Sequence, residues 1–281
     1  MTSPRRRNRP EGSPSEPVFD REAELHHFTK RELFKNVRPS QLRPLLRKDK
    51  LGNDISRICR LKANEELNPI RNENAYVYVI IRGYVAIWMI SRFNPKKETF
   101  LAWRGPEQII GEMRPIHGAD PFTSAINTCE PCEFLEIQNS AFVNLAETTP
   151  VIYRNIAKLL VKKMGSERNR SEVIQTQSRK RRTAQTLIYL AEERCGKDRF
   201  DSARKLKIPG TIHQDELGAY GGFRRESVNR HLGSFRRRKI ISYTANKRGN
   251  QITILEPDEL KKLAAIQMRS ARKDREKRNP K

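Results

Sequence analysis

Residues 222–232 read Gly-Phe-Arg-Arg-Glu-Ser-Val-Asn-Arg-His-Leu. Arg225, Glu226 and Arg230 lie at i, i+1 and i+5, and positions i and i+5 of an α-helix are about 140° apart, so the three share one half of the helix. Two apolar residues, Val228 and Leu232, lie on the other half. An exposed charged helix is the simpler interpretation. However, arginine fits the two acceptors of guanine, and a carboxylate accepts from the amino group of cytosine. The stretch therefore predicts a helix that lies in the DNA major groove.

The segments on either side fit the same motif. Residues 211–222 predict a first helix, with Thr211 as its N-cap and two carboxylates in its first turn. The pair Gly221-Gly222 allows the chain to turn into the second helix. Residues 240–255 hold two β runs around a turn-rich basic loop, which is typical of a hairpin. Helix, turn, helix and a basic hairpin together predict a winged helix-turn-helix.

Composition points to a polyanionic partner. The chain has 281 residues, a formal net charge of +24 and a pI near 10.3. Its length predicts about two domains, and the charge favours nucleic acid as the partner. No apolar run approaches the roughly 20 residues needed to span a bilayer, and the N-terminus lacks the apolar core of a secretory signal. Four cysteines do not indicate a disulfide framework. We therefore expect a cytoplasmic protein without a membrane partner.

The N-terminal half changes from helical to β patterning. Residues 1–20 are predicted to be a disordered basic tail, and residues 21–50 to form short helices. Residues 55–137 hold short β runs at regular spacing, which predicts a small antiparallel barrel or roll. The clearest runs are 76–81 and 84–90, on either side of a turn at Gly83, and the strictly alternating run 132–137.

The helical period returns after Ser140. Residues 140–177 predict two helices, with Pro150 opening the longer one. The apolar stripe of that helix thins beyond Met164, so a coiled coil is weakly indicated there. Residues 179–191 predict a further helix, and residues 195–208 a polar loop.

A β-roll, a long connecting helix and a winged helix-turn-helix together resemble one family, the bacterial transcription regulators of the cyclic-AMP receptor protein/FNR (CRP/FNR) superfamily. The resemblance covers about residues 30–260. It rests on residues 33–37, 76–85, 111–113, 182–187 and 225–230, and the last segment is the most specific.

The resemblance implies an α+β fold with a cyclic-nucleotide-binding-like β-roll domain at residues 21–148. A connecting and dimerisation helix at 149–178 and a winged helix-turn-helix domain at 179–262 would follow. A basic C-terminal tail at 263–281 completes the expected division of the chain.

The resemblance also assigns DNA contacts. The base-reading trio of the family, Arg, Glu and Arg, corresponds to Arg225, Glu226 and Arg230. Basic and hydroxyl residues around this helix are the expected contacts to the DNA backbone. These are Arg224, Ser227, Arg236, Arg237, Lys247 and Arg248.

The effector site departs from the family pattern. Members that bind cyclic AMP carry an arginine about eleven residues past the cassette glycine, followed by a small hydroxyl residue; residues 120–125 contain no arginine. Glu167 and Arg168 stand where such members have a Thr-Ser pair. The site is thus degraded or altered, and its remaining candidate residues are Gly111, Glu112, Thr123 and Ser124. Glu112 either binds a ribose-like hydroxyl or is satisfied by backbone amides.

The sequence gives only weak signals for a metal, redox or catalytic site. Cys129 and Cys132 form one C-x-x-C pair without a second pair or a histidine nearby, which is a weak metal signal; a redox role stays open. The five histidines lack metal-ligand spacing, and no nucleophile, Walker A or dinucleotide motif is present. We therefore expect no catalytic residues, no metal and no cofactor.

These observations favour a non-enzymatic, sequence-specific regulator that binds palindromic double-stranded DNA as a homodimer through a helix centred on residues 151–175. RNA polymerase and an unidentified small-molecule effector are further candidate partners. Two alternatives remain. One is a sensor of a nucleotide other than cyclic AMP, and the other is a nucleic-acid-binding protein of low specificity.

Overall fold

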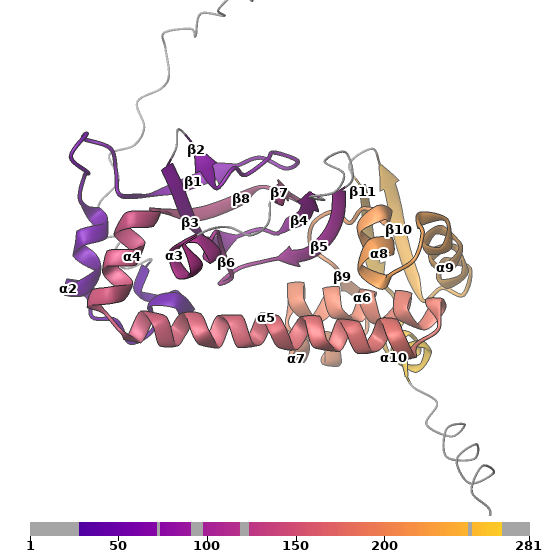
Figure 1. Cartoon of the computed structure of the whole chain (residues 1–281). Helices are drawn as coiled ribbons and strands as arrows, with labels where there is room; N and C mark the ends of the chain where they lie inside the picture. Colours follow the sequence, from indigo (N-terminus) through magenta and orange to yellow (C-terminus); the bar gives the residue numbers. More distant parts are fainter. Residues whose placement is uncertain (1–27, 72–73, 91–97, 119–123, 247–248, 266–281) are drawn as a thin grey trace, which may run out of the picture.

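The computed structural model has a strand-rich N-terminal part, one long helix, and a C-terminal part of helices with a hairpin (Figure 1). It describes residues 28–71, 74–90, 98–118, 124–246 and 249–265. The predicted tail at residues 1–20 lies outside this range, as does most of the tail at 263–281. The α+β fold class and the order β-roll, long helix, winged helix-turn-helix are confirmed.

Short helices open the described chain, as predicted. They are η1 (Glu32–Phe34), α2 (Pro39–Leu42) and η2 (Arg43–Leu46). Their apolar residues are buried in one cluster with Phe142 and Ile152, which come about a hundred residues later. The cluster includes residues of the long helix, so it attaches the first described residues to that helix. Burying each such side chain stabilises the folded state by about 1.5–3 kcal/mol.

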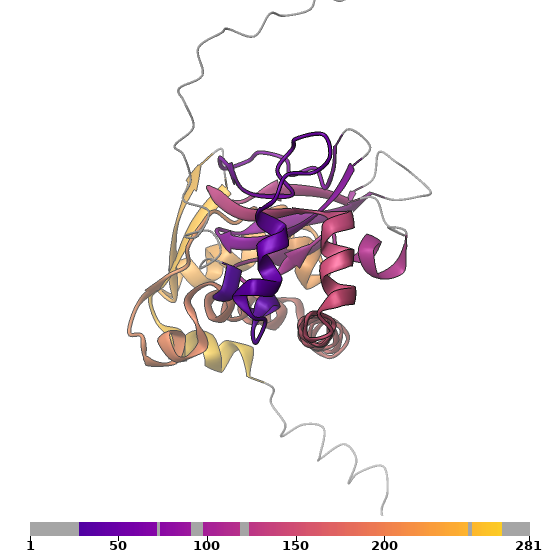
Figure 2. The ribbon, with the colours of Figure 1, turned by 90° about the vertical axis from the view of Figure 1, so that its left-hand side faces the viewer.

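The roll consists of two antiparallel sheets. One has the order β1-β8-β3-β2 with β6 beside β3, and the other has the order β5-β4-β7. Their strands are β1 (Ser56–Leu61), β2 (Ile70–Arg71), β3 (Asn74–Arg82), β4 (Val85–Ile90), β5 (Glu98–Arg104), β6 (Ile109–Ile110), β7 (Ser124–Thr128) and β8 (Cys132–Gln138). A short helix, α3 (Met113–His117), follows β6. The strands fill the space above the long helix in both views (Figures 1 and 2).

The two β runs on either side of the turn at Gly83 do not form a hairpin. β3 pairs with β2, β6 and β8, whereas β4 pairs with β5 and β7, so the two strands lie in different sheets. Gly83 has φ +87°, and a Cβ at this position would lie 2.6 Å from Sγ of Cys132. The glycine therefore moves the chain from one sheet to the other where no side chain fits.

Burial along β8 does not follow its sequence alternation. Phe134, Leu135, Glu136 and Ile137 are all buried. Leu135 and Ile137 pack in one core cluster and Phe134 in another, so both faces of the strand are covered. Glu136 is compensated by Arg57 of the neighbouring strand, whose Nε lies 2.9 Å from its carboxylate.

Two helices connect the roll to the C-terminal part. They are α4 (Asn139–Thr148) and the long α5 (Val151–Thr176), which begins after Pro150 as predicted. The buried amide of Asn155 anchors α5 to the N-terminus by donating to the carbonyls of Leu33 and Lys35, at 3.0 and 2.8 Å. Figure 1 shows α5 running beneath both parts of the protein.

The C-terminal part has its own core. Its elements are α6 (Arg179–Cys195), α7 (Lys197–Ser202), β9 (Leu206–Lys207), α8 (Gln214–Gly221), α9 (Arg225–Arg237), β10 (Ile241–Asn246), β11 (Gly249–Ile254) and α10 (Pro257–Ala264). The hairpin of β10 and β11 is confirmed, and β9 extends its sheet. The predicted polar loop at 195–208 is wrong, since it contains α7 and β9. Phe200, Leu206 and Ile208 hold it in the core.

Among the described helices, none combines the length and the apolar character that a membrane span requires.

Candidate nucleic-acid interface

The turn between α8 and α9 depends on glycine. Gly222 ends α8 in the left-handed conformation, with φ +70°. A Cβ on Gly218 would lie 2.7 Å from the carbonyl oxygen of Phe223, so a side chain there would push the two helices apart. The N-cap of α8 is His213, not Thr211 as expected. The Thr211 hydroxyl instead donates to the carbonyl of Cys129, at 2.9 Å.

The two faces of α9 separate as the sequence indicates. Val228 and Leu232 are fully buried, and so is Phe235, which extends the same stripe by one turn. Arg225, Glu226 and Arg230 lie on the exposed side. Helix α9 therefore presents charged side chains over a face that nothing in the described chain covers.

Arg225 already has a protein partner. Its Nη1 lies 3.4 Å from Oδ2 of Asp215 in α8, and both side chains are more than half exposed. Pairs of this kind contribute little to stability in water. Releasing Arg225 for another acceptor therefore has a small cost.

The expected backbone contacts surround α9. Arg224 is its N-cap without a side-chain capping bond, and Arg236 and Arg237 are exposed in its last turn. The guanidinium of Arg236 lies 5.5 Å from the ring centre of Tyr243, which links α9 to β10. Ser227 is half-buried in the first turn. The other two expected contacts, Lys247 and Arg248, lie outside the described residues.

The basic run at 179–182 is divided between two environments. Arg179 and Lys180 are exposed, but Arg182 turns inward. Its guanidinium donates to the carbonyl of Gly221 at 2.9 Å and lies 5.5 Å from the ring centre of Phe223. Desolvation, followed by the nearby Arg179, lowers the pKa of Arg182. Arg182 therefore stabilises the turn of the helix-turn-helix and is not available as a phosphate contact.

His231 lies on the same helix in a positively charged setting. Its Nδ1 is 2.8 Å from the hydroxyl of Thr183. Burial, together with the charges of Arg230, Lys180 and Arg179, lowers the pKa of the ring. The histidine is therefore neutral at neutral pH and contributes shape, not charge.

Arg170 connects α5 to both neighbouring parts, and sequence patterning gave no signal for it. Its guanidinium donates to the carbonyls of Tyr220 and Ala219 in α8, at 3.0 and 3.2 Å, and to the carbonyl of Leu101 in β5, at 2.6 Å. The Tyr220 ring centre lies 4.5 Å away. A cation at the C-terminal carbonyls of α8 also complements the helix dipole.

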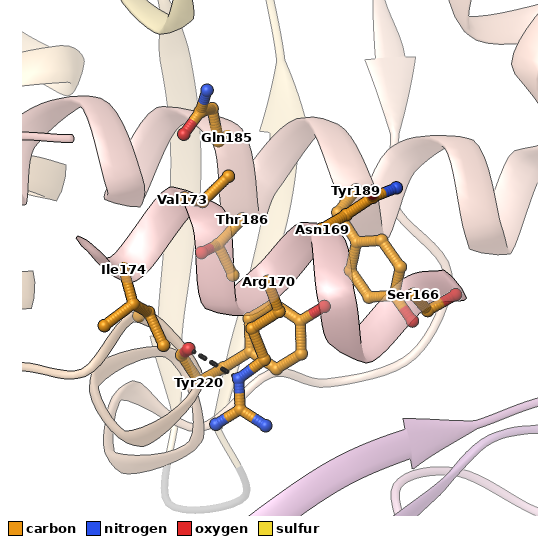
Figure 3. A pocket seen from close by; sticks show the side chains of 10 residues that line it. Ser166, Asn169, Arg170, Val173, Ile174, Gln185, Thr186, Tyr189 and Tyr220 are labelled. Atoms are coloured by element: carbon orange, nitrogen blue, oxygen red, sulfur yellow. Dashed lines mark hydrogen bonds between the residues drawn. The ribbon is translucent and has the colours of Figure 1, made fainter. Parts of the chain in front are cut away.

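A cavity of about 130 Å³ lies at this junction, between α5, α6 and α8. Figure 3 shows Arg170 beside the stacked rings of Tyr189 and Tyr220. The aromatic rings and the guanidinium thus hold the first helix of the helix-turn-helix against α5.

The expected ligand residues that lie within the described ranges are already in contact with other parts of the protein. Glu112 is buried, and its carboxylate accepts from Nζ of Lys163 in α5 at 2.5 Å. Lys163 Nζ also donates to the carbonyl of Ile109, at 2.9 Å. The expectation that backbone amides satisfy Glu112 is therefore wrong. Burial lowers the pKa of Lys163, and the Glu112 charge opposes that shift.

The other three ligand candidates are spread along the same region. Gly111 has φ +81°, and a Cβ there would lie 2.5 Å from the carbonyl oxygen of Tyr76. Its role is therefore to let the backbone approach β3. Ser124 is half-buried at the start of β7 and pairs with Met89, while Thr123 lies outside the described residues.

The C-x-x-C pair is packed in the interior. Cys129 and Cys132 are both buried as free thiols. Burial raises the pKa of Cys132 to about 12, and that of Cys129 further still. Because the thiolate is the reactive form, these pKa values disfavour thiol chemistry. The described residues contain no group of three or more His, Cys, Asp or Glu side chains that would hold a metal ion.

Comparisons with known proteins agree with this arrangement. Residues 181–263 match the model of the Crp-like helix-turn-helix domain. The fumarate and nitrate reduction regulatory protein of Vibrio cholerae is 24% identical over 226 residues, covering 79% of this chain and 84% of its own length. The CRP-like cAMP-activated global transcriptional regulator of Mycobacterium tuberculosis is 25% identical over 167 residues, or 59% and 70% of the two chains.

Solved structures share the fold. FixK2 from Bradyrhizobium japonicum superposes with a TM-score of 0.57 at 16% identity, covering 75% of this chain and 98% of its own. A CRP/FNR family regulator from Thermus thermophilus superposes with a TM-score of 0.55 at 19% identity, covering 74% and 98%. The matched domain gives the C-terminal part a Crp-like helix-turn-helix, and the related sequences and the shared architecture make the chain similar to transcription regulators of the CRP/FNR superfamily.

Proposed function

We propose that this regulator binds specific palindromic DNA sites and that Arg225, Glu226 and Arg230 read the bases. The observation that carries the proposal is the division of α9 into a fully buried apolar face and an exposed face bearing these three side chains. Arginine and glutamate on a helix in the major groove distinguish G·C pairs by their donors and acceptors. Arg224, Ser227, Arg236 and Arg237 flank this face and contact phosphates, with Lys247 and Arg248 assigned from sequence.

Homodimerisation through α5 is part of the same proposal. Val161 and Met164 on this helix are 67% and 70% exposed, although apolar side chains gain free energy when removed from water. They lie three residues apart, so they share a face. The helix has 26 residues and is therefore about 39 Å long. Pairing two copies along it would present two α9 helices to successive major grooves, about 34 Å apart.

The domain division follows from these roles. We assign the β-roll domain to residues 21–148, the connecting and dimerisation helix to 149–178, and the winged helix-turn-helix domain to 179–262. The tails at 1–20 and 263–281 add basic residues at both ends.

The effector site is altered relative to members that bind cyclic AMP. Two observations support this. The segment at 120–125 lacks the arginine that would neutralise a cyclic phosphate, and the Glu112 carboxylate is already held by Lys163 at 2.5 Å. A ribose hydroxyl at Glu112 would have to compete with a buried ion pair. A response to a nucleotide other than cyclic AMP is the second candidate function, favoured by the retained roll around Gly111 and Glu112.

The test is selection of bound fragments from a random DNA pool, with the full-length protein. We expect a two-fold symmetric consensus with half-sites one helical turn apart. Recovery of unrelated sequences would contradict base reading and leave the low-specificity alternative. A consensus containing one unrepeated half-site would contradict the dimer while leaving base reading intact.

A further inference from the structure

A second cavity, of about 390 Å³, lies where the roll, α5 and α6 meet. Its walls come from η1, from the loop that joins β5 to β6, from one face of α5, and from Tyr189 and Glu193 of α6. The volume falls in the range of about 300–1,000 Å³ that is usual for small-molecule sites. A DNA duplex is far too wide for it, so the charges inside have another explanation than operator binding.

Three acidic side chains line this cavity, and each has a partner within the protein. The carboxylate of Glu32 lies 3.9 Å from Nζ of Lys35. Glu107 accepts from Nη1 of Arg31 at 2.6 Å and from the backbone N–H of Glu32 at 2.9 Å. Glu193 accepts from Nε2 of Gln108 at 2.6 Å. These contacts fix the carboxylates of Glu107 and Glu193 in the cavity wall and stabilise their negative charge.

The lysines of the same cavity are not paired in this way. Lys158 and Lys162 lie four residues apart on α5, so both point to one side of the helix. Both are exposed, and within the described ranges no carboxylate lies at ion-pair distance from either ammonium group. Arg104, only 11% exposed, adds a third cation, and its nearest carboxylate, that of Glu167, is 3.9 Å away. The cavity therefore offers free positive charge beside acids that are already engaged.

Neutral groups complete the wall. Tyr189 presents an aromatic ring, and the buried Oε1 of Gln108 accepts no hydrogen bond among the described residues. An acceptor left unpaired in this way is costly, and a hydroxyl or amine donor placed beside it would remove the cost.

We propose that this cavity binds a phosphorylated small molecule. Lys158 and Lys162 would hold the phosphate, and Tyr189 and Gln108 would contact the remainder of the ligand. A phosphate suits two lysines because it presents several acceptor oxygens to compact point charges. Glu112 is not part of the cavity wall, although its partner Lys163 is, and the proposal does not depend on the assignment of base-reading residues.

The position of the cavity connects it to DNA binding. Ser166 and Tyr189 line this cavity and also the smaller one beside Arg170 (Figure 3). A bound ligand would contact side chains that pack directly against the first helix of the helix-turn-helix. Differential affinity for two positions of α6 would then shift DNA binding.

The experiment is isothermal titration of the full-length protein, without DNA, with three probes: adenosine 5′-monophosphate, glucose 6-phosphate and inorganic pyrophosphate. The paired variant is Lys158→Gln with Lys162→Gln. The matched control is Arg154→Gln with Arg168→Gln, which removes the same charge from exposed positions of the same helix outside this cavity. Substitutions at exposed positions of this kind leave folding essentially unchanged.

We expect at least one probe to bind the wild type. The lysine pair variant should bind that probe about tenfold more weakly or worse, because each charge-assisted hydrogen bond that is lost weakens binding by roughly that factor. The control variant should keep its affinity within about twofold. No heat of binding for any probe at millimolar concentration overturns the proposal. Equal weakening in both variants also overturns it, since it indicates a response to net charge alone. Because DNA is absent, neither outcome bears on base reading.

Discussion

Nε1 of Trp103 donates a 2.9 Å hydrogen bond to Oε2 of Glu216, and this bond joins β5 of the roll to the first helix of the helix-turn-helix. Both side chains are buried. Burial raises the pKa of Glu216, and the bond from Trp103 counteracts that shift by stabilising the carboxylate. The position of α8 on the roll therefore rests on a polar contact inside an aromatic cluster that includes Phe100 and Tyr220.

Replacing Trp103 with Phe should destabilise the protein more at pH 7.5 than at pH 5. A group whose pKa is raised in the folded state stabilises that state at low pH and loses the contribution as pH rises through the folded pKa. Without the Trp103 donor, the buried carboxylate of Glu216 keeps only the 3.4 Å bond from the backbone N–H of His213. The ionised form is then less stabilised, at a cost of about 1–3 kcal/mol. Chemical denaturation at the two pH values measures the free energy of unfolding.

Two variants control for this prediction. Trp88→Phe removes a similar ring from the same cluster and should show no added pH dependence. Glu216→Gln keeps an acceptor for Trp103 without the charge, and it should flatten the pH dependence. If Trp103→Phe lost the same stability at both pH values, the indole would act by packing alone.

Arg225→Ala and Glu226→Ala should lower sequence discrimination more than general DNA affinity. Both side chains lie on the exposed face of α9, and a misread base pair costs about 1–3 kcal/mol. Gel-shift titrations on the selected site and on random DNA give the ratio of the two affinities. Arg237→Ala, at the C-terminal end of α9, should instead weaken both complexes alike. Equal losses on both DNAs for the Arg225 variant would assign it to the backbone.

Cyclic AMP at micromolar concentration should neither raise the melting temperature nor tighten DNA binding. The cassette lacks its arginine, and Lys163 holds Glu112. A ligand present at a hundred times its dissociation constant adds about 2.7 kcal/mol to stability, which a thermal scan detects readily. A clear upward shift of the melting temperature would show that the cassette still binds this nucleotide.

DNA binding should depend steeply on salt. Each phosphate contact contributes a slope of about −0.9 in log affinity against log salt, and a dimer doubles the number of contacts. Changing Lys247 and Arg248 to Gln should flatten the slope and weaken specific and random sites alike, without altering the consensus. Binding curves between about 50 and 200 mM salt provide the measurement. A changed consensus with an unchanged slope would instead mean that the wing reads bases.

The parts of the structure that sequence patterning predicted are local. The buried and exposed faces of α9 are predicted by apolar residues that recur with a period of about 3.6 residues. The wing, which is the hairpin of β10 and β11, is predicted by two β runs around a turn. The pairing of strands that are distant in sequence could not be predicted in this way. The pattern around Gly83 resembles a hairpin, and only the pairing partners of β3 and β4 show that the two strands lie in different sheets. In residues 195–208, frequent polar residues hide the single buried ring of Phe200.

The contacts that position the site are harder still to predict. Trp103 and Glu216 are 113 residues apart, and Lys163 and Glu112 are 51 apart. Glu216 has the sequence signature of an ordinary acidic first turn, which explains its place on α8 but not its burial. No periodicity links such residues, because their proximity depends on how whole elements pack.

Arg170 attaches α5 to two neighbouring parts of the protein. One planar guanidinium holds the carbonyl of Leu101 in the roll and those of Ala219 and Tyr220 in α8. A rotation of α5 about its own axis would move this guanidinium relative to both neighbours. The packing of α5 on the roll is therefore linked, through one side chain, to its packing on the first helix of the helix-turn-helix.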